Sequence, residues 1–101
     1  AAGGREQAVE EIPVKPEGAA RYTVPVAISP QRMEDQVVIR FRVGRNIRTG
    51  VVKVYGGDKL LYQRKRPVMA PGEMEQVVFQ KEWLTGGEDV IRVVAEEEEA
   101  Q

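Results

Sequence analysis

The sequence predicts an all-β domain, an antiparallel immunoglobulin- or fibronectin-III-like β-sandwich of about six or seven strands. Three observations predict it: apolar residues recur at every second position, turn residues recur at short intervals, and no segment has convincing helical spacing. A chain of 101 residues can form one core. We therefore expect the sandwich domain over residues 12–95, a flexible linker from an upstream domain at 1–11, and an acidic disordered tail at 96–101. A small barrel is the alternative fold.

Two proline-containing strands are predicted near the N-terminus, one starting near Ile12 and one over residues 22–26. Proline has no N–H to donate to a ladder, so both strands are expected at sheet edges or bulges. The prolines are Pro13, Pro16, Pro25 and Pro30, and the apolar positions of the second strand are Tyr22, Val24 and Val26. The chain begins without methionine in the small residues AAGG, which favours a fragment of a longer polypeptide.

The strongest strand signal covers residues 37–43, VVIRFRV. One parity is apolar and the other carries the arginines, which is the pattern of a strand with one face in the core. The apolar parity is Val37, Ile39, Phe41 and Val43, and the other is Val38, Arg40 and Arg42. Residues 44–50, GRNIRTG, are polar apart from Ile47 and have glycine at both ends, which predicts a loop.

Residues 51–66 are predicted to form a β-hairpin. A two-residue turn at Gly57 and Asp58 suits these residues, because both tolerate the positive φ that such turns require. This turn places apolar residues opposite apolar residues better than a turn at Gly56 and Gly57 does. The predicted pairs are Tyr55 with Leu60, Val54 with Leu61, and Val52 with Gln63.

The C-terminal third contains two further strands. Pro71 and Gly72 predict a turn into a strand over 73–80, and Gly86 and Gly87 predict the turn before the last strand at 89–95. Between them, Trp83 with Leu84 is expected to close one end of the core. The core side of the first strand is Val77 and Phe79.

Composition excludes most site chemistry. The chain contains neither cysteine nor histidine, so disulfides, thiol nucleophiles, thiolate metal sites and the usual general base are absent. Ser29 is the only serine and has no histidine to activate it, and phosphate-binding glycine loops are missing. No apolar run approaches the ~20 residues of a membrane span. The lack of cysteine fits a reducing cytoplasm, where we expect the protein to act.

Charge is segregated along the chain. Residues 40–66 contain nine basic residues and one acidic residue, a net charge of +8, so the rest carries −9 because the whole chain carries −1. The basic residues can form a solvated face balanced by Glu73, Glu75 and Glu82, or dock on an acidic surface of another domain. The candidate docking face is Arg40, Arg42, Lys53, Arg64 and Arg66.

Two other binding modes stay open as alternatives. Nucleic acid would need the basic cluster on one face with aromatics beside it, for which Tyr55 and Tyr62 are available, and we consider this mode unfavoured. Carbohydrate would stack on exposed aromatics such as Trp83 and Tyr62, although a chain with 6% aromatic residues needs most of them in its core.

The segments RYTVPVAIS, VVIRFRV and VVKVYGGDKLLYQRKRPVMAPGEMEQVVF together resemble a known family. They are similar to the C-terminal β-domain of bacterial FAD/NAD(P)-dependent oxidoreductases of the pyridine nucleotide-disulfide type. The resemblance spans Ile12 to Ala95. The matching positions are Arg21, Tyr22, Pro25, Arg64, Lys65, Arg66, Pro71, Gly72, Glu73, Met74 and Glu75.

The resemblance implies a non-catalytic accessory or interaction domain. No catalytic, cofactor-binding or metal-binding residue carries over, since the flavin-binding glycines and redox cysteines of such enzymes would precede Ala1. FAD and NAD(P) would then belong to the parent protein, and the partner would be the upstream catalytic domain or a partner subunit. A stand-alone binding module and a structural spacer domain are the alternatives.

Overall fold

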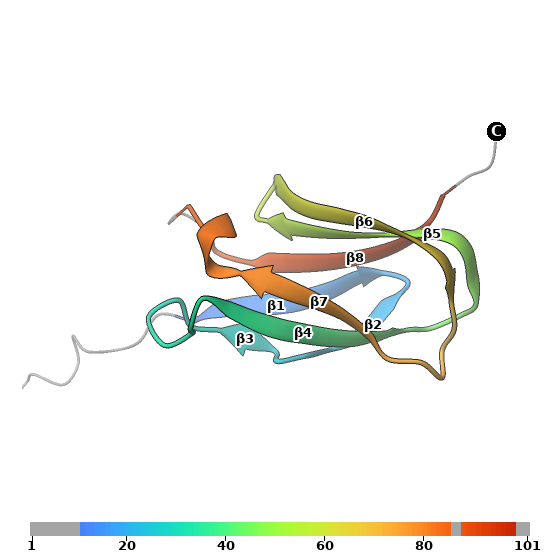
Figure 1. Ribbon diagram of the computed structural model, residues 1–101, viewed down its shortest axis with the longest axis horizontal. Coiled ribbons are helices and arrows are strands. Elements are labelled where there is room, and N and C mark those ends of the chain that lie inside the picture. The colour runs from blue at the N-terminus through green and yellow to red at the C-terminus, as the bar shows by residue number, and fades with distance from the viewer. Residues whose placement is uncertain (1–10, 86–87, 99–101) are drawn as a thin grey trace, which may run out of the picture.

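The computed structural model describes residues 11–85 and 88–98. Their secondary structure consists of eight β-strands and a single 3₁₀ turn, with no α-helix (Figure 1). The elements are β1 Ile12–Gly18, β2 Ala20–Val24, β3 Ala27–Ile28, β4 Gln36–Val43, β5 Ile47–Gly56, β6 Lys59–Met69, β7 Glu75–Gln80, η1 Lys81–Trp83 and β8 Ile91–Glu97. The predicted all-β class is therefore confirmed. Within the described ranges, no helix is long and apolar enough to cross a membrane.

The strands form two sheets. The larger has the order β3-β1-β8-β5-β6 and the smaller the order β2-β4-β7. Every strand pair is antiparallel except β1 with β8, which is parallel. The chain changes sheet at every connection except that between β5 and β6, so β2, β4 and β7 form one sheet and β1, β3, β5, β6 and β8 the other.

The core lies between the two sheets, and both contribute to it. The predicted parity of β4 is confirmed, because Ile39 and Phe41 are fully buried while Arg40 and Arg42 are exposed. Phe79 of β7 is also fully buried, as predicted. Strands β5 and β8 complete this cluster with Val52, Val54, Ile91, Val93 and Ala95.

The first strand is not at an edge as predicted. β1 lies between β3 and β8, and it pairs with β8 in parallel rather than antiparallel fashion. β3 pairs only with Ile12 and Pro13, so Pro16 has no strand partner on that side. The missing N–H of Pro16 is tolerated because Pro16 lies beyond the part of β1 that bonds to residues 26–28.

The prediction for residues 22–26 is wrong in its parity. Tyr22, Val24 and Val26 are 77%, 55% and 73% exposed. Tyr22 has a φ of +55°, and the β2–β4 register shifts between Arg21 and Val24. A bulge of this kind turns the strand, so that Thr23 instead of Tyr22 points inward.

The hairpin prediction is correct at the turn and wrong beyond it. Tyr55 pairs with Leu60 across the Gly57–Asp58 turn, as predicted. A bulge then shifts the register by one residue, so that Val54 faces Tyr62 instead of Leu61. The predicted Val52–Gln63 pair is likewise wrong, because the observed pair is Val52 with Arg64.

Three element boundaries also differ from the predictions. The strand β5 begins inside the predicted 44–50 loop, because Ile47 is fully buried and pairs with Met69. The strand β7 begins two residues later than predicted, at Glu75. The last strand continues to Glu97, so the predicted disordered tail is wrong for Glu96 and Glu97. Residues 1–10, the predicted turn at Gly86 and Gly87, and residues 99–101 lie outside the described residues.

Candidate docking surface

The structure distributes the five predicted docking residues over three surfaces. Arg40 and Arg42 lie on the outer face of the smaller sheet, because their β4 neighbours Ile39 and Phe41 face the core. Lys53 lies on the outer face of the larger sheet, between the inward-facing Val52 and Val54. Arg64 and Arg66 share the inward parity of β6, at the side of the molecule where β6 and β7 run along the two sheets.

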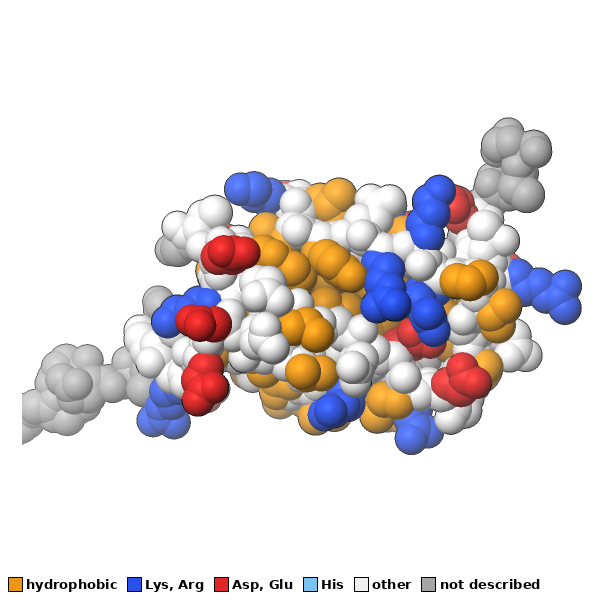
Figure 2. All heavy atoms as spheres, viewed as in Figure 1, with side chains coloured by type: hydrophobic (Ala, Val, Ile, Leu, Met, Phe, Trp, Pro, Cys, Tyr) orange, Lys and Arg blue, Asp and Glu red, His pale blue; other side chains and the backbone are white. Residues whose placement is uncertain are grey.

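The outer face of the smaller sheet combines arginines with exposed valines. The register places Arg21 directly opposite Arg42, Val24 opposite Arg40, and Val38 opposite Val78. Figure 2, drawn in the view of Figure 1, shows basic and acidic side chains toward both ends of this side of the molecule, with hydrophobic side chains between them. We call this surface the arginine face, and it consists of Arg21, Val24, Val38, Arg40, Arg42, Gln76 and Val78.

The arginines of this face have no acidic partner among the described residues. Arg40 and Arg42 form no side-chain hydrogen bond or ion pair there. The guanidinium of Arg21 donates to the carbonyl oxygens of Gly18 and Ala20, at 3.2 and 3.0 Å, and forms no ion pair with a described carboxylate, although it lines a pocket with Glu96 and Glu97. The predicted balance of Arg40 and Arg42 by glutamates of neighbouring strands is therefore not observed.

Arg66 closes the side of the sandwich between β6 and β7. Its Nε donates to Oε1 of Glu75 at 2.9 Å, and only 7% of the Glu75 side chain is exposed. At the other end of the same side, Tyr62 stacks on Trp83 with ring centroids 5.0 Å apart. The ion pair joins β6 to β7, two strands that do not pair with each other, and the ring contact joins β6 to η1. Arg64 is exposed between them.

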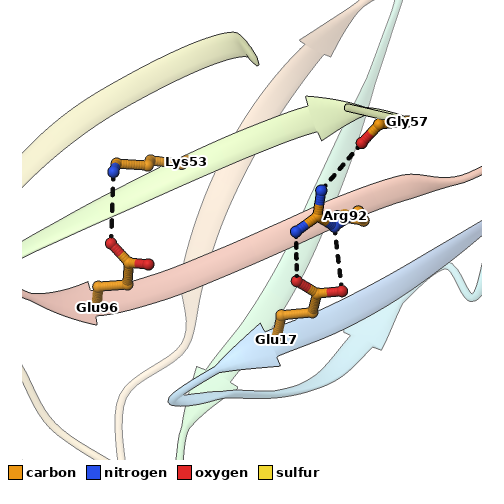
Figure 3. A network of polar contacts seen from close by, with 5 residues as sticks. All are labelled: Glu17, Lys53, Gly57, Arg92 and Glu96. Carbon is orange, nitrogen blue, oxygen red and sulfur yellow. Dashed lines mark hydrogen bonds and ion pairs between the residues drawn. The ribbon is translucent and has the colours of Figure 1, made fainter. Parts of the chain in front are cut away.

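The outer face of the larger sheet carries its own matched charges (Figure 3). Arg92 of β8 donates to both carboxylate oxygens of Glu17 on β1, at 3.1 and 2.9 Å, and to the carbonyl oxygen of Gly57 at 3.0 Å. This side-chain hydrogen bonding lowers the pKa of Glu17 and raises the pKa of Arg92. Lys53 pairs with Glu96 at 3.4 Å, so Lys53 is not a free docking residue.

The acidic end of β8 compensates much of the basic stretch. Glu97 accepts from the backbone N–H of Arg48 and from the Arg45 side chain, and both bonds lower its pKa. Lys65 pairs with Glu98 at 3.8 Å. A pocket of about 290 Å³ beside these contacts is lined by Arg21, Arg45, Glu96 and Glu97 among others, and its two glutamates already pair with Lys53 and Arg45. The segregation of charge along the sequence thus largely disappears where β8 lies beside β5.

The aromatic residues other than Tyr22 are buried or in contact with neighbouring side chains. Trp83 contacts Tyr62 face to face and Phe79 edge to face, which supports its predicted role at the end of the core. Tyr55 lies under the guanidinium of Arg92, 4.8 Å from the ring centroid. Tyr22 is exposed at the margin of the arginine face. Among the described residues, no group of acidic side chains is arranged to hold a metal ion.

Sequence reasoning identified part of the arginine face. The shared parity of Val38, Arg40 and Arg42 in β4 indicated a common surface, and the structure confirms that surface. Arg21 and Val24 were not predicted to belong to this surface. The bulge in β2 decides which sheet face they lie on, and no local sequence pattern indicates the bulge. The Glu17–Arg92 contact was also missed, since it joins residues 75 positions apart.

Comparison of the chain with protein-family models, with curated proteins and with solved structures found no significant match.

Proposed function

We propose that this chain is a non-catalytic accessory or interaction domain, with the immunoglobulin- or fibronectin-III-like architecture predicted from its sequence. We place it at the C-terminus of a cytoplasmic FAD/NAD(P)-dependent oxidoreductase, where it docks on the catalytic body or on a partner subunit. The flavin and the nicotinamide would be bound by the parent protein. The observation that carries the docking role is a sheet face with three arginines and no acidic partner among the described residues.

The residues behind the family resemblance have a structural role that supports this proposal. Arg66 and Glu75 both belong to the matched positions, and they form the ion pair between β6 and β7. Pro71 and Gly72 lie in the turn between the same strands. The motif RKRPVMAPGEME therefore holds together one side of the domain, which is what an inherited structural motif without catalytic residues would do.

The experiment that tests this proposal isolates the native protein from its source cells. An antibody to the chain would be used to purify it at low salt, and the product would be examined by native mass measurement and visible absorbance. We expect a yellow species several times larger than 11.3 kDa, with flavin absorption bands. A colourless species of 11.3 kDa would contradict the proposal, and a large colourless species would support docking but not the flavoenzyme.

A further inference from the structure

The arginine face is unusual because its register gathers like charges. Arg21 of β2 lies directly opposite Arg42 of β4, and Arg40 is the next residue of that strand on the same face. Like charges in directly opposed positions destabilise a sheet. None of the seven positions of the face is acidic, so the sheet itself does not offset this repulsion. The outer face of the larger sheet, in contrast, matches Lys53 with Glu96 and Arg92 with Glu17.

The same face leaves apolar surface exposed between the charges. Val24 is 55% exposed and Val78 is 37% exposed, and Val38 beside Val78 is half-buried. Interfaces between proteins combine arginines with apolar residues. On this face Arg40 lies between the Val38–Val78 pair at one end and the Arg21–Arg42 pair at the other. The exposed valines also distinguish this face from a purely basic surface, which would bind any polyanion.

We propose that the arginine face binds an acidic protein surface, with carboxylates opposite Arg21, Arg40 and Arg42 and apolar side chains opposite the valines. This inference rests on the proposed docking function and specifies its site and partner chemistry. A protein partner is favoured over nucleic acid because two of the three tyrosines, Tyr55 and Tyr62, are engaged on other surfaces. The docking face thus keeps Arg40 and Arg42 of the predicted residues, adds Arg21, and excludes Lys53, Arg64 and Arg66.

Arginine labelling of the native protein tests this inference. The assembly would be isolated with an antibody to the β5–β6 turn, treated with phenylglyoxal at low salt and at about 1 M salt, and analysed by mass spectrometry. At about 1 M salt the screening length falls to about 3 Å, so the attraction between arginines and carboxylates weakens and the interface should dissociate. We expect Arg40 and Arg42 to be labelled about tenfold less at low salt than at high salt. Arg64 should be labelled equally in both.

Two matched variants complete the test in the parent protein. Arg40→Glu with Arg42→Glu reverses two charges on the face, and Lys59→Glu with Arg64→Glu makes the same change in net charge on β6. We expect the first pair to expose Arg21 to labelling at low salt and the second to leave it protected. Neither variant should lower the unfolding temperature, because neither removes an ion pair between described residues, and Arg42→Glu in addition relieves the repulsion with Arg21.

The remaining outcomes overturn the inference in distinguishable ways. Equal labelling of Arg40 and Arg42 at both salt concentrations in a large species would reject this face and leave the proposed function standing. A species of 11.3 kDa would reject both. Labelling of Arg40 and Arg42 that is restored by nuclease treatment would show that phosphate groups, and not a protein surface, cover the face.

Discussion

Gly18 turns the chain from β1 into β2 with a φ of +65°. A Cβ at this position would run into the backbone carbonyl oxygen of Ala95, which accepts a hydrogen bond from the N–H of Ala19 at 2.8 Å. Both constraints come from the backbone, which cannot move aside as a flexible side chain does. This turn is therefore the position where the fold most clearly requires glycine.

A glycine series tests this requirement. We expect Gly18→Ala to reduce the free energy of unfolding by about 3 kcal/mol, from strain and collision together. Gly57 has the same φ but open space around it, so Gly57→Ala should cost about 1 kcal/mol. Gly72→Ala is the control, because nothing lies near its added Cβ. Urea unfolding followed by the single tryptophan, Trp83, measures all three, and equal stabilities would contradict the assigned turn.

Glu17 should make the stability of the folded domain depend on pH in the acidic range. The hydrogen bonds from Arg92 lower the pKa of Glu17 below its ordinary value of 4.5. Its stabilising contribution is therefore complete above that ordinary value and is lost as the pH falls through the lower pKa of the folded state. We expect Glu17→Gln to lower Tm by about 2 to 4 °C at pH 7 and by much less at pH 3.

The control for this titration is Glu73→Gln, because Glu73 forms no side-chain hydrogen bond or ion pair among the described residues. Its Tm should follow that of the unmodified chain at both pH values. A Glu17→Gln deficit of equal size at pH 7 and pH 3 would show that the carboxylate charge is not what stabilises β1 against β8.

At the scale of elements, β6 and β7 are held together by side chains and not by a ladder. Arg66→Met should reduce the free energy of unfolding by about 2 kcal/mol, because it leaves the buried Glu75 carboxylate without its partner. Arg64→Met is the matched control and should change stability by less than about 0.5 kcal/mol, since Arg64 is exposed and unpaired among the described residues.

A double variant separates the contribution of the Arg66–Glu75 ion pair from the cost of burying an unpaired Glu75 carboxylate. Arg66→Met with Glu75→Leu should recover most of the lost stability, because replacing both partners by apolar groups removes the unpaired charge. Chemical denaturation of the three variants measures this difference. A double variant less stable than Arg66→Met alone would indicate that Glu75 stabilises β7 independently of Arg66.

Strand positions and the inward parity of β4 and β7 could be predicted from sequence, whereas strand partners could not. Period-two patterning is a local signal, so it locates Ile39, Phe41 and Phe79 in the core. A bulge reverses this parity within one or two residues, as at Tyr22 in β2 and at Leu61 in β6, and no local sequence pattern indicates it. The position of β1 between β3 and β8 depends on contacts with a segment more than seventy residues away.

At the scale of the whole molecule, the two sheets share one core and should unfold together. Ile39 and Phe79 of the smaller sheet belong to the same buried cluster as Val54 and Val93 of the larger sheet. We expect urea transitions followed by Trp83 fluorescence and by far-ultraviolet circular dichroism to coincide, as in a two-state domain. Separate midpoints would show that the side closed by Trp83 and Arg66 opens before the rest.

The sequence by itself determined the all-β class, the hairpin turn at Gly57 and Asp58, the core parity of the central strand and the lack of cysteine and histidine chemistry. These features depend on residue type and local spacing. Only the tertiary structure decided which basic side chains lack an acidic partner among the described residues. Pairing of β8 with β5 and β1 brings carboxylates to Lys53 and Arg92, while the bulged pairing of β2 with β4 leaves Arg21, Arg40 and Arg42 together without one. Such pairing is set by packing over the whole chain, because a side chain's charge partner depends on which strand lies beside it.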